Sequence, residues 1–562
     1  NQSNGPTSYE ANGRTIKVDM KLRRQFDIYE DTLNAYFDTT VAIQDELLLR
    51  SLSQQRTSQM SAITTTIQKE QNEVIRHKDV PALLVNGIAG SGKTSVLLQR
   101  IAYLFYQNRE TLNPEQVYLI TPNPVFRSYI DNVLPDMGEK NPHILTWDEF
   151  ATHVVPAGRT FDSVHTTMDV FHRIDEVVPD LSFNEKDFKD IKLKGVTLIS
   201  AAQINKIAAR FKNVPAGPRL ITLVREELED RFESRLGQMA GTEQFQDQVR
   251  ALSYNQQLAL FGEPANMDSE QQAKEYTQKF LEFQFGEART TIALNHWVRV
   301  DRIAKRLLNI ENLSFLEWLY LKISCTGMVN DEAKFVMIDE VQDYSPCQLA
   351  VMARYYKRAH FLLLGDENQS ITDHSSTFEE VREVFGEHRG EVSECYLMTS
   401  YRSTPAITEL FAKLAINNTG MQISSVQRDD KEPELIVCTN EEEFDANLKR
   451  VVTNLAGEKG LTAVVVNTEQ ELTEIWNKLS SYVAQDQLCF ISDGSTLPEH
   501  GVLLIDLQLA KGLEFDNVII PDADCETYPE TDLAKRQLYT AISRATNTVS
   551  ILAKKKLTTL LA

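Results

Sequence analysis

The chain has 562 residues and a net charge of −22, and its composition is that of a folded globular protein. At about 150 residues per domain, this length predicts three or four domains. No apolar run reaches the roughly 18 residues of a membrane span, the N-terminus is not a signal peptide, and the cysteines are scattered without metal-ligand spacing. We therefore expect a cytoplasmic protein with reduced thiols and no membrane partner. The acidic balance weakly favours a basic protein partner over nucleic acid.

The chain begins with a segment of alternating polarity. Over residues 13–38, the apolar residues Ile16, Val18 and Met20 alternate with polar and charged ones, a period of two that predicts β-strands. A helical pattern follows from about Val41 to Arg76. We expect residues 1–62 to form a small β/α lead-in to the first main domain.

A phosphate-binding loop lies between a strand and a helix. Apolar runs at residues 82–85 and 117–121 enclose the helix-like segment SVLLQRIAYLFY, a βαβ pattern that predicts a parallel sheet. After the first run, GIAGSGKT matches G-x-x-x-x-G-K-[ST], whose backbone N–H groups surround phosphates. Lys93 should reach the β- and γ-phosphates, and Thr94 should hold Mg²⁺. The expected nucleotide contacts of this loop are Gly87, Gly90, Ser91, Gly92, Lys93, Thr94 and Ser95.

Residues 151–330 differ in character, because they contain long amphipathic stretches and few strand signals. Apolar residues recur every four positions in one of these stretches, which is typical of a helix face. They are Leu220, Val224, Leu228, Phe232 and Leu236. The region is nearly neutral, and its pattern fits either a packing subdomain or a functional arm. We interpret it as a helical insertion in the first main domain.

Strand-like runs resume after the insertion and alternate with helical segments, which predicts further parallel α/β structure. The runs lie at residues 335–338, 361–364, 435–437, 463–466, 502–505 and 518–520. The first of them, FVMIDE, ends in Asp339 and Glu340. Following a phosphate-binding loop, this pattern predicts that Asp339 holds Mg²⁺ through water and that Glu340 polarises the attacking water.

The motifs together resemble superfamily 1 helicases of the UvrD/Rep type. The segment IQKEQ looks like the Q motif, in which Gln71 would read the adenine edge. The segment GDENQSI matches the third motif, and Gln369 would sense the γ-phosphate. In YRST, Tyr401 would stack on adenine and Arg402 would contact the γ-phosphate.

Two later motifs extend the resemblance. In KGLEF, Gly512 and Glu514 would lie at the nucleotide, with Glu514 on the ribose, and in LYTAISRA Arg544 would be a second arginine finger. The resemblance implies an α/β fold with two RecA-like domains and an ATP- and Mg²⁺-dependent hydrolase. The first domain would comprise residues 63–150 and 331–390, and the second residues 391–562. The implied catalytic residues are Lys93, Glu340, Gln369, Arg402 and Arg544, and the implied metal ligands are Thr94 and Asp339.

Two departures from the UvrD pattern favour a narrower resemblance. The fifth motif of that family normally begins T-x-H and contacts single-stranded DNA, but Asp506-Leu-Gln508 stands here. The interval from Arg402 to Lys511 also leaves little room for the DNA-engaging domain that UvrD-like helicases place there. Instead, PNPVFRSYIDNVLP, the phosphate-binding segment and IDEVQDYSPCQL resemble the HelD family, bacterial motors that bind RNA polymerase and recycle stalled complexes.

The HelD resemblance covers residues 13–150 and 331–562. It implies that residues 151–330 form an arm that enters the main channel of the polymerase and displaces nucleic acid. We expect a monomeric ATPase acting on bacterial RNA polymerase core. A DNA helicase acting on single-stranded DNA and a binding module with a vestigial ATPase site remain alternatives, and the intact Lys93, Glu340, Arg402 and Arg544 count against the second.

Overall fold

A computed structural model provides the structure of the chain. Up to residue 38 it describes the backbone of residues 5–11, 14–20, 24–29 and 32–38. From residue 69 it describes everything except residues 123–133, 136–139, 157, 162–165, 194–195, 373–374, 417–422, 426–430, 457–459, 485–486, 493–497, 499 and 562. None of the described helices is long and apolar enough to cross a membrane.

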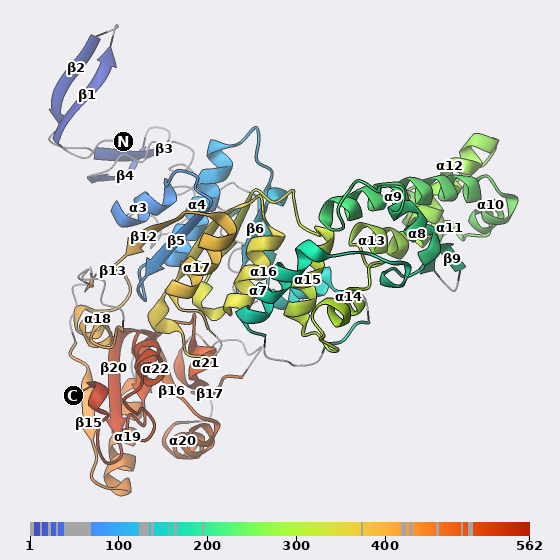
Figure 1. Cartoon of the computed structure of the whole chain (residues 1–562). Coiled ribbons are helices and arrows are strands. Elements are labelled where there is room, and N and C mark those ends of the chain that lie inside the picture. Colours follow the sequence, from blue (N-terminus) through green and yellow to red (C-terminus); the bar gives the residue numbers. More distant parts are fainter. Residues whose placement is uncertain are drawn as a thin grey trace. The chain divides into compact units, whose positions relative to one another are not determined.

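The described residues form two compact units. One contains Asn1–Trp147, Glu332–Ser345 and Ala359–Ala562, and the other contains Asp148–Asp331 together with Pro346–Arg358. The first unit holds both large parallel sheets, and the second is mainly helical (Figure 1).

The N-terminal segment forms two antiparallel strand pairs, which confirms the strands predicted over residues 13–38. Strand β1 (Gly5–Ala11) pairs with β2 (Arg14–Met20), and β3 (Arg24–Tyr29) pairs with β4 (Thr32–Asp38). Of the helix predicted from Val41 to Arg76, the structure describes α3 (Lys69–Ile75), and residues 41–68 lie outside the described chain. The same holds for the first two residues of the IQKEQ motif.

The first large sheet has six parallel strands in the order β12-β5-β11-β10-β6-β7. These are β5 (Ala82–Gly87), β6 (Val117–Ile120), β7 (His143–Leu145), β10 (Phe335–Ile338), β11 (His360–Gly365) and β12 (Val392–Leu397). The associated helical segments are α4 (Lys93–Gln107), α17 (Phe378–Arg389), η1 (Pro114–Gln116), η4 (Val341–Asp343) and η5 (Glu367–Gln369). Helix α6 (Trp147–Val154) follows β7 and belongs to the second unit from Asp148 onward. Leu97 and Ile101 of α4 pack with Val85, Leu119 and Met337 of the strands, so the predicted βαβ unit is confirmed.

The second sheet is also six-stranded and parallel, in the order β15-β20-β19-β16-β18-β17. Its strands are β15 (Glu434–Val437), β16 (Leu461–Val466), β17 (Leu488–Phe490), β18 (Gly501–Asp506), β19 (Phe515–Ile520) and β20 (Ala545–Ala553). Its helices are α18 (Pro405–Ala412), α19 (Glu441–Ala456), α20 (Glu469–Tyr482), α21 (Leu507–Ala510), α22 (Asp532–Ile542) and η6 (Thr559–Leu561). A short parallel pair, β13 (Thr399–Ser400) with β14 (Ser424–Ser425), lies between the sheets in sequence.

Both faces of the second sheet are covered by helices. On β16, Ala463 and Val465 belong to one apolar cluster, whereas Val464 and Val466 belong to another. Alternate side chains of a strand point to opposite faces, so the two clusters lie on the two sides of the sheet. This accounts for the unbroken apolar run of the strand, which is typical of parallel sheets. The chain therefore has an α/β fold with two RecA-like parallel-sheet domains.

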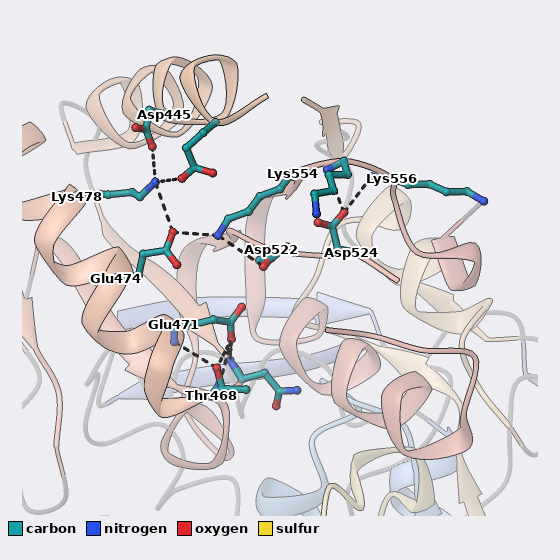
Figure 2. Close-up of polar contacts among 12 residues, drawn as sticks. Asp445, Thr468, Glu471, Glu474, Lys478, Asp522, Asp524, Lys554 and Lys556 are labelled. Carbon is teal, nitrogen blue, oxygen red and sulfur yellow. Dashed lines mark hydrogen bonds and ion pairs between the residues drawn. The ribbon is translucent and has the colours of Figure 1, made fainter. Parts of the chain in front are cut away.

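A network of charges ties two helices of the second domain to its sheet (Figure 2). Lys478 on α20 forms ion pairs with Glu441 and Asp445 of α19 and with Glu474 one turn earlier. Glu474 in turn accepts a hydrogen bond from Lys554 Nζ, after β20, at 2.9 Å. Only 16% of the Lys478 side chain is exposed, so these contacts are less screened by solvent than ordinary surface pairs.

The second unit contains the helices of the predicted insertion. They are α7 (Met168–Val177), α8 (Ala201–Ala208), α9 (Pro218–Ala240), α10 (Glu243–Arg250), α11 (Tyr254–Phe261), α12 (Glu270–Gln284), α13 (Gly286–Ala293), α14 (Val300–Leu307) and α15 (Phe315–Thr326), joined by α16 (Pro346–Tyr355). Two short 3₁₀ segments, η2 (Val178–Asp180) and η3 (Glu185–Asp187), and a hairpin of β8 (Ile191–Leu193) and β9 (Val196–Ile199) complete it. All five residues of the predicted apolar stripe on α9 are buried, which confirms the helix and its inward face.

Candidate nucleotide site

Three functional segments follow neighbouring strands of the first sheet. Strands β5, β11 and β10 are adjacent and parallel, so their carboxyl ends meet at one edge. The phosphate-binding loop follows β5, Asp339 and Glu340 follow β10, and Gly365 and Asp366 lie at the end of β11. This edge is where open α/β sheets bind their ligands.

The glycines of the phosphate-binding loop are required by its geometry. Gly90 has a φ of 72° and Gly92 a φ of 78°, in the left-handed region that L side chains disfavour. A Cβ atom on Gly90 would lie 2.7 Å from Ser400 Oγ, and one on Gly92 would lie 2.7 Å from Gln71 Nε2. The amide of Gln71 also donates a hydrogen bond to the carbonyl of Ser91 at 3.0 Å. The loop is thus a cradle that any side chain at Gly90 or Gly92 would obstruct.

Lys93 lies inside this loop. Its Nζ donates hydrogen bonds to the carbonyl oxygens of Gly87 at 2.9 Å and Ile88 at 3.3 Å, and only 8% of the residue is exposed. Thr94 and Ser95 follow in the first turn of α4 and are half-buried. The loop therefore presents one ammonium, two hydroxyls and the N–H groups of a helix N-terminus together, a combination suited to phosphate and Mg²⁺.

Two acids after β10 have opposite electrostatic environments. Burial, and then the charge of Glu340, raise the pKa of Asp339 to about 7, although Lys93 opposes this shift. For Glu340, burial opposes ionisation, but Lys93 and Lys511 outweigh it and lower its pKa. Glu340 is therefore the charged member of the pair near neutral pH. Its backbone is also unusual, with a φ of 49°.

Glu340 is linked to the next strand by a glutamine. Gln342 is fully buried, and its Nε2 donates to Glu340 Oε2 at 2.7 Å. The Oε1 atom of the same amide accepts from the backbone N–H of Asp366 at 3.1 Å. The glutamine amide thus fixes the Glu340 carboxylate relative to the segment that follows β11.

The chain of contacts continues from there to the second domain. Gln369 Nε2 donates to Asp366 Oδ2 at 2.6 Å, and Arg544 Nη2 donates to Gln369 Oε1 at 2.7 Å. The hydroxyl of Tyr539 also donates to Asp366 Oδ2, at 3.0 Å, and accepts from the N–H of Ala89 in the phosphate-binding loop at 3.3 Å. Burial, followed by the charge of Arg402, lowers the pKa of Arg544 to about 10, so this guanidinium remains charged at neutral pH.

Further contacts join the two domains around the loop. The N–H of Tyr401 donates to the carbonyl of Gly90 at 2.8 Å, so this residue and Arg402 lie against the phosphate-binding loop. Lys511 of the second domain forms an ion pair with Asp343 of the first, whereas the ion pair of Arg402 with Glu514 lies within the second domain. Gly512, with a φ of 81°, lies between Lys511 and Glu514, the two residues of its motif that form these ion pairs.

The structure therefore gathers the residues expected at the site. Lys93, Glu340, Gln369 and Arg544 belong to one electrostatic and hydrogen-bonded group, and Arg402 borders it. Thr94 and Asp339 lie after β5 and β10, whose carboxyl ends are at the same edge of the sheet with β11 between them. Gln71 contacts the loop at Ser91 and Gly92. Sequence reasoning assigned no role to Gln342, Tyr539 or the pair of Lys511 with Asp343. Of these residues, Tyr539 could have been found from the sequence, because it lies in the same motif as Arg544.

Comparisons with known proteins agree with this arrangement. Residues 67–374 match the UvrD/REP helicase N-terminal domain, and residues 501–552 match the UvrD-like helicase C-terminal domain. DNA helicase IV of Escherichia coli K12 is 23% identical over 246 residues, which are 40% of this chain and 34% of that protein. The chain thus spans about a third of the length of this curated relative.

One similar solved structure is the C-terminal domain of a possible DNA helicase from Lactobacillus plantarum WCFS1. It shows 29% identity and covers 29% of this chain and 92% of that one, with a TM-score of 0.25. The family assignment rests instead on the N-terminal domain match, which extends over more than half of the chain and contains the phosphate-binding loop and the Asp339-Glu340 pair. The chain belongs to the UvrD/REP helicase family, whose members are ATP-hydrolysing enzymes.

Proposed function

We propose that this protein is an ATP-driven motor that binds bacterial RNA polymerase core and releases nucleic acid from stalled complexes. The observation that carries the proposal is the place of the insertion. Residues 148–331 form most of a compact helical unit, inserted between β7 and β10 of the first domain. This is where the HelD resemblance puts an arm.

The residues of the site fit ATP with Mg²⁺, because the loop has the cradle shape and cationic lining that a triphosphate requires. In this proposal Lys93, Arg402 and Arg544 contact the phosphates, and Thr94 and Asp339 hold the metal. Gln71 and Tyr401 flank the adenine, and Gly512 and Glu514 lie at the ribose. The bound nucleotide supplies the phosphoryl group that is transferred to water.

Glu340 is the residue proposed to act on that water. It remains charged beside Lys93 and Lys511, and Gln342 holds its carboxylate in place. The contacts from Gln342 through Asp366 and Gln369 to Arg544 then connect the water-activating side of the site with the second domain. A change in phosphate occupancy would alter this chain of contacts and so bias the arrangement of the two domains.

Features of the second domain favour a partner other than extended DNA. Asp506 caps α21, where its Oδ1 accepts from the N–H of Gln508 at 2.7 Å, so the fifth motif begins with a structural carboxylate. Between Arg402 and Lys511, the described residues form β14 and strands and helices of the second sheet, and they contain no separate domain.

The insertion also exposes large apolar side chains. Tyr254 is 63% exposed and Phe283 74% exposed, and both belong to helices of the second unit. Exposed aromatic residues are enriched at protein interfaces. They are therefore the first positions at which we expect contact between the insertion and a protein partner.

The proposal is tested by measuring whether the protein retains core polymerase and whether it releases nucleic acid from stalled complexes. The full-length chain should retain core polymerase from a bacterial lysate and should release nucleic acid from purified stalled complexes when ATP is added. Glu340→Gln should bind polymerase without ATP-dependent release. Tyr254→Ser combined with Phe283→Ser should weaken retention while sparing basal ATPase activity, whereas Phe490→Ser, an exposed aromatic of the second domain, is the matched control.

A DNA-translocating motor is the second candidate, because the relative described above is named DNA helicase IV. That function predicts strong stimulation of ATP hydrolysis by single-stranded DNA and unwinding of a tailed duplex. These results, together with no retention of polymerase, would replace the first proposal with the second.

A further inference from the structure

A polar cavity of about 370 Å³ lies within the helical unit, apart from the residues of the nucleotide site. It is formed by the loop after α6, the segment before β8, the connection between α13 and α14, the first turn of α14, and α15. Its lining residues are Pro156, Arg159, Lys189, His296, Val298, Arg299, Asp301, Arg302, Trp318 and Lys322. Among them are five Lys or Arg residues and a single carboxylate.

The floor of the cavity holds buried polar groups without partners. Lys322 is 1% exposed, and its Nζ has no hydrogen-bond partner among the described residues. The ammonium lies 4.7 Å from the ring centroid of Trp318, one helical turn earlier on α15. His296 is 8% exposed, and its Nε2 also lacks a partner in the described chain. Buried polar groups are rarely left in this condition.

The rim of the cavity adds further positive charge. Lys189, Arg299 and Arg302 are exposed, and none forms an ion pair within the described part of the chain. Arg159 does pair with Asp301, through Nη1 and Oδ2 at 3.0 Å. This pair neutralises one of the five cations, so most of the positive charge is left uncompensated.

The positively charged groups of the cavity lie close enough to one another to be mutually unfavourable. Burial, and then the charges of Lys189 and Arg159, lower the pKa of Lys322 well below its usual value. Burial, followed by Lys322, lowers the pKa of His296 to about 3. Both shifts favour the uncharged forms of these side chains, and buried groups perturbed in this way that also line a cavity indicate a functional site. An anion in the cavity would give these groups the partner they lack.

We infer that this cavity is a binding site for a compact, multiply charged phosphate anion, such as an inorganic polyphosphate or the polyphosphate group of a nucleotide. Guanidinium groups bind phosphate oxygens with paired, charge-assisted hydrogen bonds, and lysine acts as a point charge on the same groups. The volume falls within the range of small-molecule sites. The cations converge on one cavity, which suits a compact anion better than the extended phosphate backbone of a nucleic acid.

The experiment measures binding of inorganic tripolyphosphate to the full chain by isothermal titration calorimetry. Because the phosphate-binding loop also accepts phosphates, four proteins are compared: the wild type, Lys93→Ala, Lys322→Met and the double variant. Binding should persist in Lys93→Ala. Adding Lys322→Met should weaken the remaining binding about 10- to 100-fold, the effect expected for loss of a charge-assisted hydrogen bond.

Controls separate this site from general charge effects. Lys274→Met removes an exposed lysine of α12 and should leave binding unchanged. Arg302→Gln, at the exposed rim, should weaken tripolyphosphate binding about 10-fold. It tests the site independently if Lys322→Met does not fold. ATPase activity should be the same in Lys322→Met as in the wild type, so failure here is distinguishable from failure of the motor proposal.

Three outcomes would overturn the inference. The first is that no tripolyphosphate binding remains in Lys93→Ala at millimolar ligand. The second is that the remaining binding is insensitive to both Lys322→Met and Arg302→Gln. If a single-stranded oligonucleotide bound in a Lys322-dependent way while tripolyphosphate did not, the cavity would belong to a nucleic-acid surface, and the inference would be wrong.

Discussion

Arg544, which follows α22 of the second domain, donates a 2.7 Å hydrogen bond from Nη2 to Oε1 of Gln369, which follows β11 of the first. The guanidinium is fully buried, and Gln369 is in turn held by Asp366 at 2.6 Å. An arginine of the second domain is thus positioned by a glutamine of the first.

Replacing Arg544 should separate nucleotide binding from turnover. Arg544→Ala removes a cation proposed to stabilise the transferring phosphoryl group, so kcat for ATP should fall about 10³-fold or more, with little change in nucleotide affinity. Steady-state ATPase assays and binding of a fluorescent nucleotide analogue measure the two effects. Arg450→Ala, an exposed arginine on α19, is the control. An unchanged kcat would remove Arg544 from the site.

Glu340→Gln should inactivate the site with little disturbance of its structure. The amide has nearly the same shape and can still hydrogen-bond with Gln342, but it cannot polarise water as a carboxylate does. We expect kcat to fall about 10²- to 10⁴-fold while ATP still binds. Activity near the wild-type value would show that another group activates the water.

Tyr539→Phe tests the contact between Asp366 and the phosphate-binding loop. It removes the hydroxyl that joins Asp366 Oδ2 to the N–H of Ala89. Asp366, which holds Gln369, then loses its hydrogen bond from the Tyr539 hydroxyl. We therefore expect kcat to fall about 10-fold, corresponding to roughly 1.4 kcal/mol. Tyr528→Phe, another buried tyrosine of the second domain, should leave kcat unchanged. Equal effects of the two substitutions would indicate a general loss of stability.

Gly90→Ala should prevent nucleotide binding. The new methyl group would meet Ser400 Oγ at 2.7 Å and Arg402 Cβ at 2.8 Å, and the φ of 72° is unfavourable for alanine. We expect loss of ATP binding in calorimetry. Gly386→Ala is a matched control, because it lies within α17 and its added Cβ would meet nothing within 4 Å. That variant should be slightly more stable than the wild type, by about 0.5–1 kcal/mol.

Asp522 should make stability depend on pH. Its burial raises its pKa to about 6, although Lys554 opposes the shift (Figure 2). A carboxyl with a raised pKa binds its proton more tightly in the folded state, so its contribution to stability declines as pH rises from about 4 to 6. Asp522→Asn should therefore raise the thermal unfolding midpoint by about 2–5 °C at pH 8 and by less at pH 5.

The comparison residue for that experiment is Asp524. Its Oδ1 accepts from the backbone N–H groups of Lys555 and Lys556 at 3.3 and 3.1 Å. Asp524→Ala removes both hydrogen bonds and should lower the unfolding midpoint at both pH values. A stabilisation of Asp522→Asn that is the same at pH 5 and pH 8 would contradict the assignment.

The sequence was informative where chemistry is local. The phosphate-binding loop and the Asp339-Glu340 pair follow apolar strands, and the α9 stripe has a plain helical period, so these features could be predicted. Strand β12, VSECYL, could not, because its polar residues hide the pattern. The three-residue strands β7 and β17 were too short to detect.

Contacts between residues far apart in the chain could not be predicted from the sequence. The hydrogen bond of Tyr539 with Asp366 and the ion pair of Lys511 with Asp343 join segments whose separation leaves no periodic signal. The cavity around Lys322 is assembled from loops and helices spread over residues 156–322. Segments of the predicted lead-in helix and the PNPVFRSYIDNVLP motif at residues 41–68 and 123–133 lie outside the described chain, so those predictions stand untested.

The positive φ of Glu340 carries a cost in stability. A glutamate in the left-handed region costs about 1 kcal/mol or more relative to glycine, which adopts that conformation freely. Selection for stability alone would replace it with glycine, and the protein would gain thermal resistance while losing its carboxylate. Glu340→Gly should therefore yield a more heat-resistant protein that lacks the carboxylate proposed to act on water.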